Sequence, residues 1–449
     1  METMTITEEY ILTLLREKRF GELRQILSDL NPVDIAALLG EVPEENLPPL
    51  FRILPKELAA DTFVEMDNDE QEFLIHAFSD KELREVMDEM FVDDTVDIIE
   101  EMPANVVKRI LRNVDPEMRQ SINQILHYPK DSAGSIMTTE YVDLKKQMTV
   151  EEAFTRIRKT GVDKETIYTC YVTDPNRKLL GLVSVKMLLL SEKDKIIGDI
   201  METNIIYVNT MDDKEDVAKL FDKYDFLAIP VVDKESRLVG IVTVDDAMDV
   251  IQEETEEDFA KMAAIQQNEE AYFKTPSWRH AKNRILWLLV LMLSATVTGE
   301  IITHYQNAFA AVPILVAFIP MLMGTGGNCG AQSSTMVIRG LATDEIRLKD
   351  FFRVLFKETR IAFLVSIALA IVNGVRIIIQ YGDWRLAVVM DLALICTVFV
   401  AKALGCIMPM LAQKCKLDPA IMASPLITTI VDACSVLIYF CIATAVFQL

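Results

Sequence analysis

Acidic side chains gather at two places in the first part of the sequence. One group comprises Asp93, Asp94 and Asp97. A second stretch holds eight acidic residues and no basic one, namely Asp245, Asp246, Asp249, Glu253, Glu254, Glu256, Glu257 and Asp258. A solvated charge run is the usual interpretation of such a stretch. Like charges at close range repel unless a cation offsets them, however, and Mg²⁺ and Ca²⁺ prefer carboxylate oxygens as ligands. We therefore expect these groups to bind a divalent cation.

One carboxylate interrupts the last apolar stretch, Pro419–Leu449. Asp432 lies 13 residues after Pro419, which is about 20 Å along a helix and near the middle of a bilayer. The stretch contains no basic residue, and a charge in hydrocarbon costs at least ~2.5–3.5 kcal/mol. A structural pair with another helix remains open, but a ligand on a cation pathway is the interpretation we favour.

A glycine-rich motif lies inside another apolar stretch. Gly324, Gly326, Gly327 and Gly330 fall within seven residues, and glycine is a poor helix former. Small residues also allow close helix packing in membranes. We favour a bent or unwound segment whose backbone groups, with Asn328 and Gln332, line a water-filled path.

The second part of the chain predicts five transmembrane helices, because five apolar stretches each reach the roughly 20 residues that a bilayer requires. They are Ile285–Ile302, Tyr305–Ile338, Ile361–Tyr381, Leu386–Leu411 and Pro419–Leu449. Basic loops alternate with loops almost free of Lys and Arg, which predicts an internal N-terminus and an external C-terminus. Asp391 and Lys402 lie about 16 Å apart on one helix, too far to pair directly, and their roles stay open.

Charge divides the chain at the same place. Residues 277–449 contain 9 acidic and 14 basic residues, whereas residues 1–276 contain 59 acidic and 31 basic residues. The first part is therefore an acidic soluble module, and a nucleic-acid partner is not expected. The seven cysteines form no CxxC pair, so neither a disulfide framework nor a zinc site is indicated. The opening METMTITEEY lacks the features of a cleaved signal peptide.

Residues 137–253 contain an internal repeat. The segment Tyr171–Leu188 aligns with Pro230–Met248, and each reads as a β-branched strand, a polar turn, a second strand and a helix. This pattern resembles a tandem pair of cystathionine-β-synthase-type (CBS) domains. Residues 10–128 read as short amphipathic helices that often end at proline, which favours a superhelix of helical hairpins. A protein-interaction solenoid would show the same pattern.

The order of these parts resembles the MgtE family of magnesium channels and transporters. The most specific marks are GTGGNCGAQS (Gly324–Ser333), SPLITTIVD (Ser424–Asp432) and VGIVTVDDAMDVI (Val239–Ile251). The expected fold class is multidomain, with an all-α superhelical N-terminal domain, an α/β CBS pair and an all-α five-helix transmembrane domain. The expected boundaries are 1–130, 131–258 (CBS domains 137–200 and 201–253), a linking helix at 259–276, and 277–449.

The resemblance also implies a function and its residues. It implies Mg²⁺ uptake across the cytoplasmic membrane through a homodimeric pore that cytoplasmic Mg²⁺ closes, with no catalysed reaction. The pore-lining positions it implies are Gly327, Asn328 and Asp432. The Mg²⁺ ligands it implies are Asp432, Asp93, Asp97, Gly134, Glu215, Asp225, Asp246, Asp249, Glu254, Glu257 and Asp258.

Alternatives to Mg²⁺ uptake remain open at this point. A transporter of Mn²⁺, Co²⁺ or an ion-coupled solute would share this membrane half, and ion competition would separate them. A membrane-anchored enzyme or scaffold is disfavoured by Asp432 and by the absence of GxSxG, HExxH and P-loop motifs. The expected partners are membrane lipid, a second copy of the chain and Mg²⁺, and a nucleotide is a candidate ligand of the CBS pair.

Overall fold

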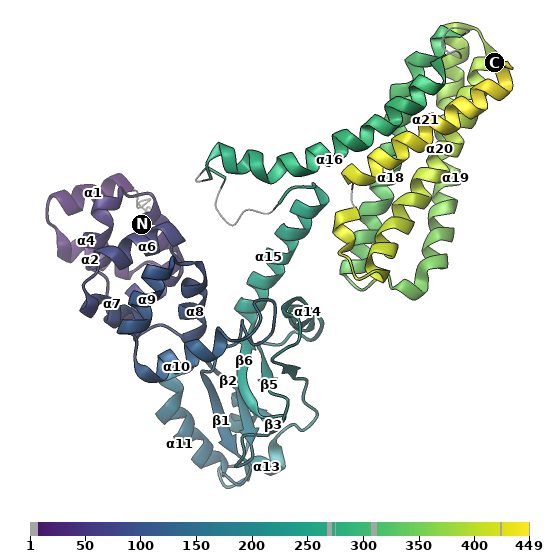
Figure 1. The fold of residues 1–449 in the computed structure, drawn as a ribbon. Helices are drawn as coiled ribbons and strands as arrows, with labels where there is room; N and C mark the ends of the chain where they lie inside the picture. Colours follow the sequence, from purple (N-terminus) through teal and green to yellow (C-terminus); the bar gives the residue numbers. More distant parts are fainter. Residues whose placement is uncertain (1–7, 267–271, 274, 307–311, 423, 449) are drawn as a thin grey trace, which may run out of the picture. The chain divides into compact units, whose positions relative to one another are not determined.

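The structure is a computed structural model that describes residues 8–266, 272–273, 275–306, 312–422 and 424–448. The chain divides into two compact units, Met1–Ile251 and Gln252–Leu449. The first unit contains a helical domain followed by two three-stranded α/β modules, and the second contains the long apolar helices (Figure 1). The predicted fold class is therefore confirmed.

The N-terminal domain is a stack of short helices. α3 packs on α5, α5 on α7 and α7 on α9, so that each contact joins elements close in sequence. Proline begins α3 and α10, where its missing N–H costs nothing, and Ser79 and Glu82 form a capping box on α7. The helices are α1 (Glu8–Arg16), α2 (Phe20–Ser28), α3 (Pro32–Gly40), α4 (Leu47–Phe51), α5 (Lys56–Val64), α6 (Asn68–Ala77), α7 (Asp80–Met87), α8 (Val92–Glu101), α9 (Ala104–Asn113) and α10 (Pro116–Ile125), with a 3₁₀ turn at Glu44–Asn46.

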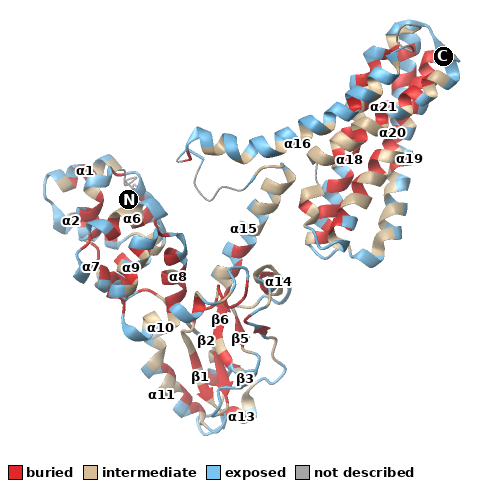
Figure 2. Ribbon diagram, viewed as in Figure 1, coloured by how far each residue is buried: buried red, intermediate tan, exposed pale blue. Residues whose placement is uncertain are grey.

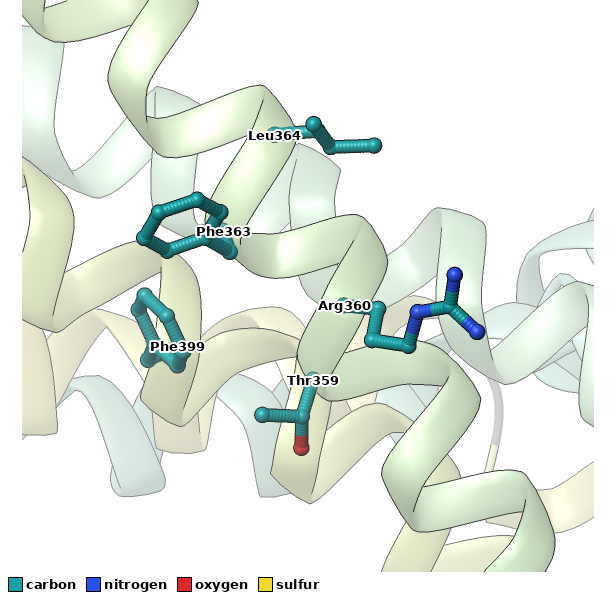
Figure 3. A pocket seen from close by; sticks show the side chains of 5 residues that line it. All are labelled: Thr359, Arg360, Phe363, Leu364 and Phe399. Atoms are coloured by element: carbon teal, nitrogen blue, oxygen red, sulfur yellow. The ribbon is translucent and has the colours of Figure 1, made fainter.

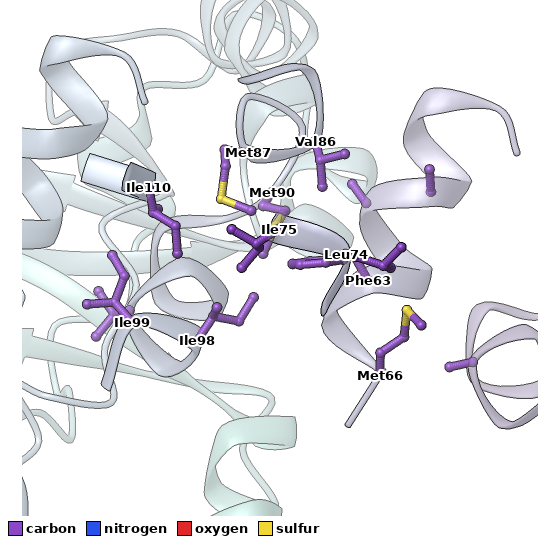
Figure 4. Close-up of a cluster of buried hydrophobic side chains, with 14 of the residues drawn as sticks. Phe63, Met66, Leu74, Ile75, Val86, Met87, Met90, Ile98, Ile99 and Ile110 are labelled. Atoms are coloured by element: carbon purple, nitrogen blue, oxygen red, sulfur yellow. The ribbon is translucent and has the colours of Figure 1, made fainter. Parts of the chain in front are cut away.

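Each helix of this domain buries one apolar stripe. Figure 4 shows part of the resulting core, where Phe63, Leu74, Ile75, Met87 and Ile110 come from four different helices, α5, α6, α7 and α9. All five side chains are fully buried. Apolar burial contributes roughly 25 cal/mol per Å², so the stack is held by this shared core although no helix here exceeds ten residues.

The internal repeat is confirmed as two modules of the same topology. In each, the first strand pairs in parallel with the second, and the second pairs antiparallel with the third. The first module comprises β1 (Tyr141–Lys145), α11 (Val150–Thr160), β2 (Thr166–Thr173), β3 (Leu179–Ser184) and α12 (Val185–Leu190). The second comprises α13 (Ile197–Ile200), β4 (Val208–Asn209), α14 (Lys214–Tyr224), β5 (Ala228–Val232), β6 (Leu238–Thr243) and α15 (Val244–Met262).

Part of the predicted linking segment 259–276 falls within the described chain. Its first residues, 259–262, form the last turn of α15, and residues 263–266 follow without regular structure. Residues 267–271 and 274 lie outside the described residues.

The five predicted transmembrane spans correspond to five helical stretches long and apolar enough to cross a membrane: Ser277–His304, Pro313–Ala342, Leu348–Tyr381, Trp384–Lys414 and Pro419–Phe447. Their α-helices are α16 (Ser277–His304), α18 (Ile319–Ala342), α19 (Phe351–Tyr381), α20 (Trp384–Lys414) and α21 (Ser424–Phe447). Short 3₁₀ segments precede three of them, at Pro313–Phe318, Leu348–Asp350 and Pro419–Met422. α20 is the most buried and packs against α18, α19 and α21 (Figure 2).

The expected bend at Gly324–Gly330 is wrong, because α18 runs as one regular helix through the whole motif. The glycines serve close packing instead. A Cβ on Gly326 would lie 2.8 Å from Ser435 Oγ and 2.8 Å from Thr397 Cγ2, on two different helices. A Cβ on Gly405 of α20 would clash with the carbonyl oxygen of Gly330 on α18. Packing contacts with α20 and α21 therefore override the low helix propensity of glycine.

Candidate cation sites

The first candidate site centres on Asp93, in the first turn of α8. Its side chain is only 7% exposed, and Oδ1 is buried without a hydrogen-bond partner among the described residues. Burial raises the pKa of Asp93 well above its ordinary value, and the charges of Asp246, Asp94, Glu165 and Glu140 raise it further. A buried carboxylate surrounded by four others is stable as an anion only with a counter-cation.

Neighbouring carboxylates are perturbed in the same direction. Burial, followed by the charge of Asp245, raises the pKa of Asp94 to about 6 and that of Glu165 to about 8. Burial also raises the pKa of Asp246 to about 7, although Thr243 Oγ1 donates a hydrogen bond of 2.5 Å to this carboxylate. We call Asp93, Asp94, Glu140, Glu165, Asp245 and Asp246 the acidic cluster.

Backbone contacts explain how distant segments meet in the acidic cluster. The amide of Glu165 donates to the carbonyl of Glu140 at 3.0 Å, which joins the chain just before β1 to the chain just before β2. The amide of Val92 donates to Glu140 Oε2 at 3.1 Å, which attaches the start of α8 to the same point. Asp93 and Asp246 were predicted from the sequence, whereas Glu140 and Glu165 were not. Each directly precedes a strand of the first α/β module, β1 or β2, and this shared position was the available signal.

Gly134 and Asp97 lie near the same domain junction. Gly134 is buried and donates its amide to Thr210 O at 3.0 Å. A Cβ there would lie 2.5 Å from the Tyr128 ring, so glycine is required for packing. Asp97 is exposed one helical turn after Asp93, so the two carboxylates share a face of α8.

The remaining predicted ligands of the first unit are more open. Glu215 lies in the first turn of α14 and pairs with Lys219 at 2.8 Å. Asp225 caps the other end of α14 with a left-handed φ of 54° and is exposed. Asp249 is exposed on α15. These three residues do not join the acidic cluster.

The end of α15 contacts the membrane helices through an ion-pair network within the second unit. Lys261 Nζ lies 2.7 Å from Glu257 Oε1 and 2.6 Å from Asp418 Oδ2. Met262 packs with Ile338 and Ala420. Glu254 and Asp258 are half-buried on the same helix. Lys261 therefore joins this acidic helix to the segment preceding α21, a contact that was not predicted from the sequence.

Asp432 is the ninth of the 24 residues of α21 and is half-buried. Its Oδ1 is buried and has no hydrogen-bond partner in the described chain. Thr428, one helical turn earlier, contacts α18, because a Cβ on Gly327 would lie 2.7 Å from Thr428 Cγ2. Asn328 is exposed next to Gly327. The predicted pore residues therefore lie on adjoining turns of α18 and α21.

Two other charges in the membrane helices have protein partners. Lys402 Nζ is buried, donates to Ser333 Oγ at 3.0 Å and lies 3.5 Å from Glu358 Oε2. Ser333 Oγ donates to Glu358 at 2.6 Å. This network joins α18, α19 and α20, so Lys402 is paired inside the protein and does not extend towards water.

Asp391 also has a partner. It accepts a hydrogen bond of 2.9 Å from Asn373 Nδ2, and Asn373 Oδ1 accepts one of 3.2 Å from Arg376. Asp432 thus differs from Asp391 and Glu358 in lacking a described partner for its buried oxygen.

Within the described residues, no three His, Cys, Asp or Glu side chains surround a single point closely enough to form a metal cage. Both candidate sites do contain a buried carboxylate oxygen with unused hydrogen-bonding capacity, at Asp93 and at Asp432. Such groups suit a hydrated Mg²⁺, which usually keeps several waters and binds through one or two carboxylates.

A multi-pass membrane unit joined to an acidic module with tandem CBS topology defines a multidomain membrane protein. Three family models match the chain in the corresponding order: "MgtE intracellular N domain" at residues 30–131, "CBS domain" at 133–193 and 197–253, and "Divalent cation transporter" at 319–442. The last of these describes transporters and not enzymes.

Similar proteins give the same assignment. The chain is 34% identical over 435 residues to the magnesium transporter MgtE of Bacillus subtilis (97% of this chain, 96% of the relative). It is 35% identical to the magnesium transporter MgtE of Thermus thermophilus (96% of each chain). The chain belongs to the MgtE family.

Solved structures resemble the first unit. A crystal structure of the cytosolic domain of the Mg²⁺ channel MgtE in complex with ATP is 36% identical and has a TM-score of 0.52, covering 54% of this chain and 99% of that one. The soluble part of a magnesium transporter is 31% identical with the same TM-score, covering 55% and 97%.

Proposed function

We infer that this protein carries Mg²⁺ across the cytoplasmic membrane through a pore lined by Asp432, Asn328 and Gly327, and that cytoplasmic Mg²⁺ closes the pore. The proposal rests mainly on Asp432. A divalent cation at hydrocarbon depth needs negative charge and exchangeable oxygen ligands, and Asp432 offers a buried oxygen without a described partner. The magnesium transporters to which the chain is similar support Mg²⁺ as the ion.

A homodimer is the proposed assembly. Large apolar side chains are exposed on the first α/β module, including Tyr168, Leu189 and Leu190 at 67%, 68% and 77% exposure. Exposed apolar groups of this kind usually mark a protein interface. In a two-fold assembly one patch would meet its own copy, and two Asp432 side chains would face one pathway.

The proposed orientation places the N-terminus in the cytoplasm and the C-terminus outside. Arg279, Lys282 and Arg284 precede the apolar core of α16. Further basic residues lie between α18 and α19 and after α20, whereas the other loops contain almost no Lys or Arg. Positive residues flanking membrane helices favour the cytoplasmic side. The acidic module then samples cytoplasmic Mg²⁺.

Electrostatic repulsion is the proposed sensing force. Without Mg²⁺ the ionised carboxylates of the acidic cluster repel each other and favour separation of α8 from the start of α15. Bound Mg²⁺ offsets this repulsion and favours closure of the pore. Its proposed ligands are Asp93, Asp97, Gly134, Glu215, Asp225, Asp246, Asp249, Glu254, Glu257 and Asp258. Each bound ion shifts the equilibrium towards the closed state only by the difference between its binding free energies for the closed and the open state. Several weak sites that act together therefore produce a steep response to Mg²⁺.

A nucleotide is a proposed second ligand of the CBS pair. The support is the solved cytosolic domain in complex with ATP, which shares 36% of its residues with this chain. Equilibrium dialysis of the protein with ATP tests this binding. Absence of saturable binding would contradict it.

Another divalent cation is the alternative cargo, because carboxylates also bind Mn²⁺ and Co²⁺. Flux of each ion with and without excess Mg²⁺ distinguishes the candidates. We expect Mg²⁺ to inhibit uptake of the others at comparable concentrations.

Mg²⁺ uptake into proteoliposomes containing an internal indicator tests the role of Asp432. Asp432→Ala should abolish uptake, and Asp432→Asn should retain part of it through its amide oxygen. Asp391→Asn is the matched control, because Asp391 is a membrane carboxylate that already accepts a hydrogen bond from Asn373. Wild-type uptake by a folded Asp432→Ala protein would refute the proposed pathway.

A further inference from the structure

Basic and aromatic side chains share the exposed surface of α19 near its beginning. Arg353, Lys357 and Arg360 recur at i, i+4 and i+7, which places them on one stripe of the helix. They make no ion pair with any residue that the structure describes. The adjoining exposed stripe is aromatic, with Phe352, Phe356 and Phe363 exposed by 80%, 65% and 56%.

An open groove of about 350 Å³ lies where these stripes reach α20. Four residues of α19 line it, Thr359, Arg360, Phe363 and Leu364, together with Phe399 of α20. Figure 3 shows the Arg360 guanidinium extending away from the two phenylalanine rings. Thr359 Oγ1 already donates to the Leu355 carbonyl at 2.7 Å, so Arg360 is the polar donor of the groove.

The position of Arg360 along α19 corresponds to a membrane boundary. It directly precedes the uncharged stretch 361–375, which continues into the hydrocarbon region. Arg and Lys at such a boundary extend their charged ends to the headgroup level while their stems lie along apolar surface. α19 and α20 are joined by a short turn and pack together, so the basic end of α20 at Lys414 and Lys416 lies at the same end of the pair.

We propose that this groove binds an anionic phospholipid. Arg360 and Lys357 hold the phosphate, and an acyl chain lies along Phe363, Leu364 and Phe399. Charge complementarity favours this occupant, because the stripe presents three cations and no acid. A second copy of the chain on this face would bring three more cations against them, and burying unpaired like charges is strongly unfavourable.

Native mass spectrometry of the full-length protein tests the proposal directly. The protein is reconstituted with equal amounts of phosphatidylglycerol and phosphatidylcholine, extracted in mild detergent, and its retained lipids are counted. We expect wild type to retain phosphatidylglycerol preferentially. Each charge removed should lower that retention about fivefold, since one Lys or Arg near an anionic surface contributes about 1 kcal/mol. The variants are Lys357→Gln and Arg360→Gln, with Arg360→Lys to preserve the charge.

Arg385→Gln is the matched control, because Arg385 is a cation beside an aromatic ring, Trp384, at the opposite end of α20. It should retain phosphatidylglycerol like wild type. Equal retention by Arg360→Gln and wild type would overturn the proposal, as would full competition by soluble glycerol phosphate, which indicates a simple anion site. A change in oligomeric state in Phe363→Ala would also overturn it, by identifying this face as a contact between copies.

Discussion

Lys261 Nζ lies 2.6 Å from Asp418 Oδ2 and 2.7 Å from Glu257 Oε1, so one ammonium group joins the acidic helix α15 to the segment that begins the Asp432 helix. The contact needs no metal ion. It attaches α15 directly to the segment before α21, so the position of α15 can influence the proposed ion pathway.

Substitution of Lys261 should therefore weaken closure. In Lys261→Met the two carboxylates lose their shared cation, and the Mg²⁺ concentration for half-inhibition should rise by about 1.4- to fivefold, since partly exposed ion pairs contribute roughly 0.2–1 kcal/mol. Flux measured against cytoplasmic Mg²⁺ checks this, with Lys261→Arg as the charge-preserving control. An unchanged half-inhibition concentration in Lys261→Met would contradict the expected role.

The acidic cluster predicts an unusual pH dependence of stability in chelator. Its carboxyl pKa values are raised to about 6 for Asp94, about 7 for Asp246 and about 8 for Glu165. The folded state therefore binds more protons than the unfolded state, and stability should fall as pH rises from about 5 to 8. Thermal unfolding of the full-length protein between these pH values should show this decrease, and saturating Mg²⁺ should reduce it.

Glu82 provides a contrast within the same unit. A hydrogen bond from Arg52 is the main cause that lowers the pKa of Glu82 to about 2, so this carboxylate stays ionised over the tested range. Asp93→Asn should flatten the pH dependence, and Glu82→Gln should leave its slope unchanged. The same slope in Asp93→Asn and wild type would exclude the acidic cluster as its source.

Two glycines of one motif should respond differently to alanine. At Gly326 a Cβ would lie within 2.9 Å of side chains on α20 and α21, whereas at Gly324 nothing lies within 4 Å. Gly326→Ala should lower the unfolding temperature in detergent, because overpacking costs roughly 1–3 kcal/mol. Gly324→Ala should leave it unchanged or raise it. Equal tolerance at both positions would contradict the close packing of α18.

Removal of one partner of the buried Lys402–Glu358 ion pair should lower the unfolding temperature more than removal of both partners. Lys402→Met leaves Glu358 charged and buried, at a cost of about 3–5 kcal/mol. The double variant Lys402→Met/Glu358→Gln should recover much of the loss, as measured by thermal unfolding in detergent. Strict additivity of the single changes would show that the two charges do not interact.

Local patterns in the sequence predicted the elements well, and contacts between distant residues account for what they missed. The five spans follow from uninterrupted apolar stretches, and the α/β repeat follows from alternating strands and turns. The bend predicted at Gly324–Gly330 was wrong, because helix propensity does not include the close packing of neighbouring helices that glycine allows. Glu140 and Glu165 join the acidic cluster only because β1 and β2 pair in parallel, and no pattern in a single chain reveals that Lys402 meets Glu358.

Mg²⁺ flux through the reconstituted wild-type protein, measured as Mg²⁺ on the cytoplasmic side is increased, tests whether the transported ion closes its own pathway. We expect flux at low Mg²⁺ and a steep decrease in flux at high Mg²⁺. In Glu254→Gln/Glu257→Gln/Asp258→Asn that decrease should shift to higher concentration. Flux that is independent of cytoplasmic Mg²⁺ in the wild-type protein, or an identical inhibition curve in the triple variant, would show that Mg²⁺ bound to the acidic module does not close the pathway.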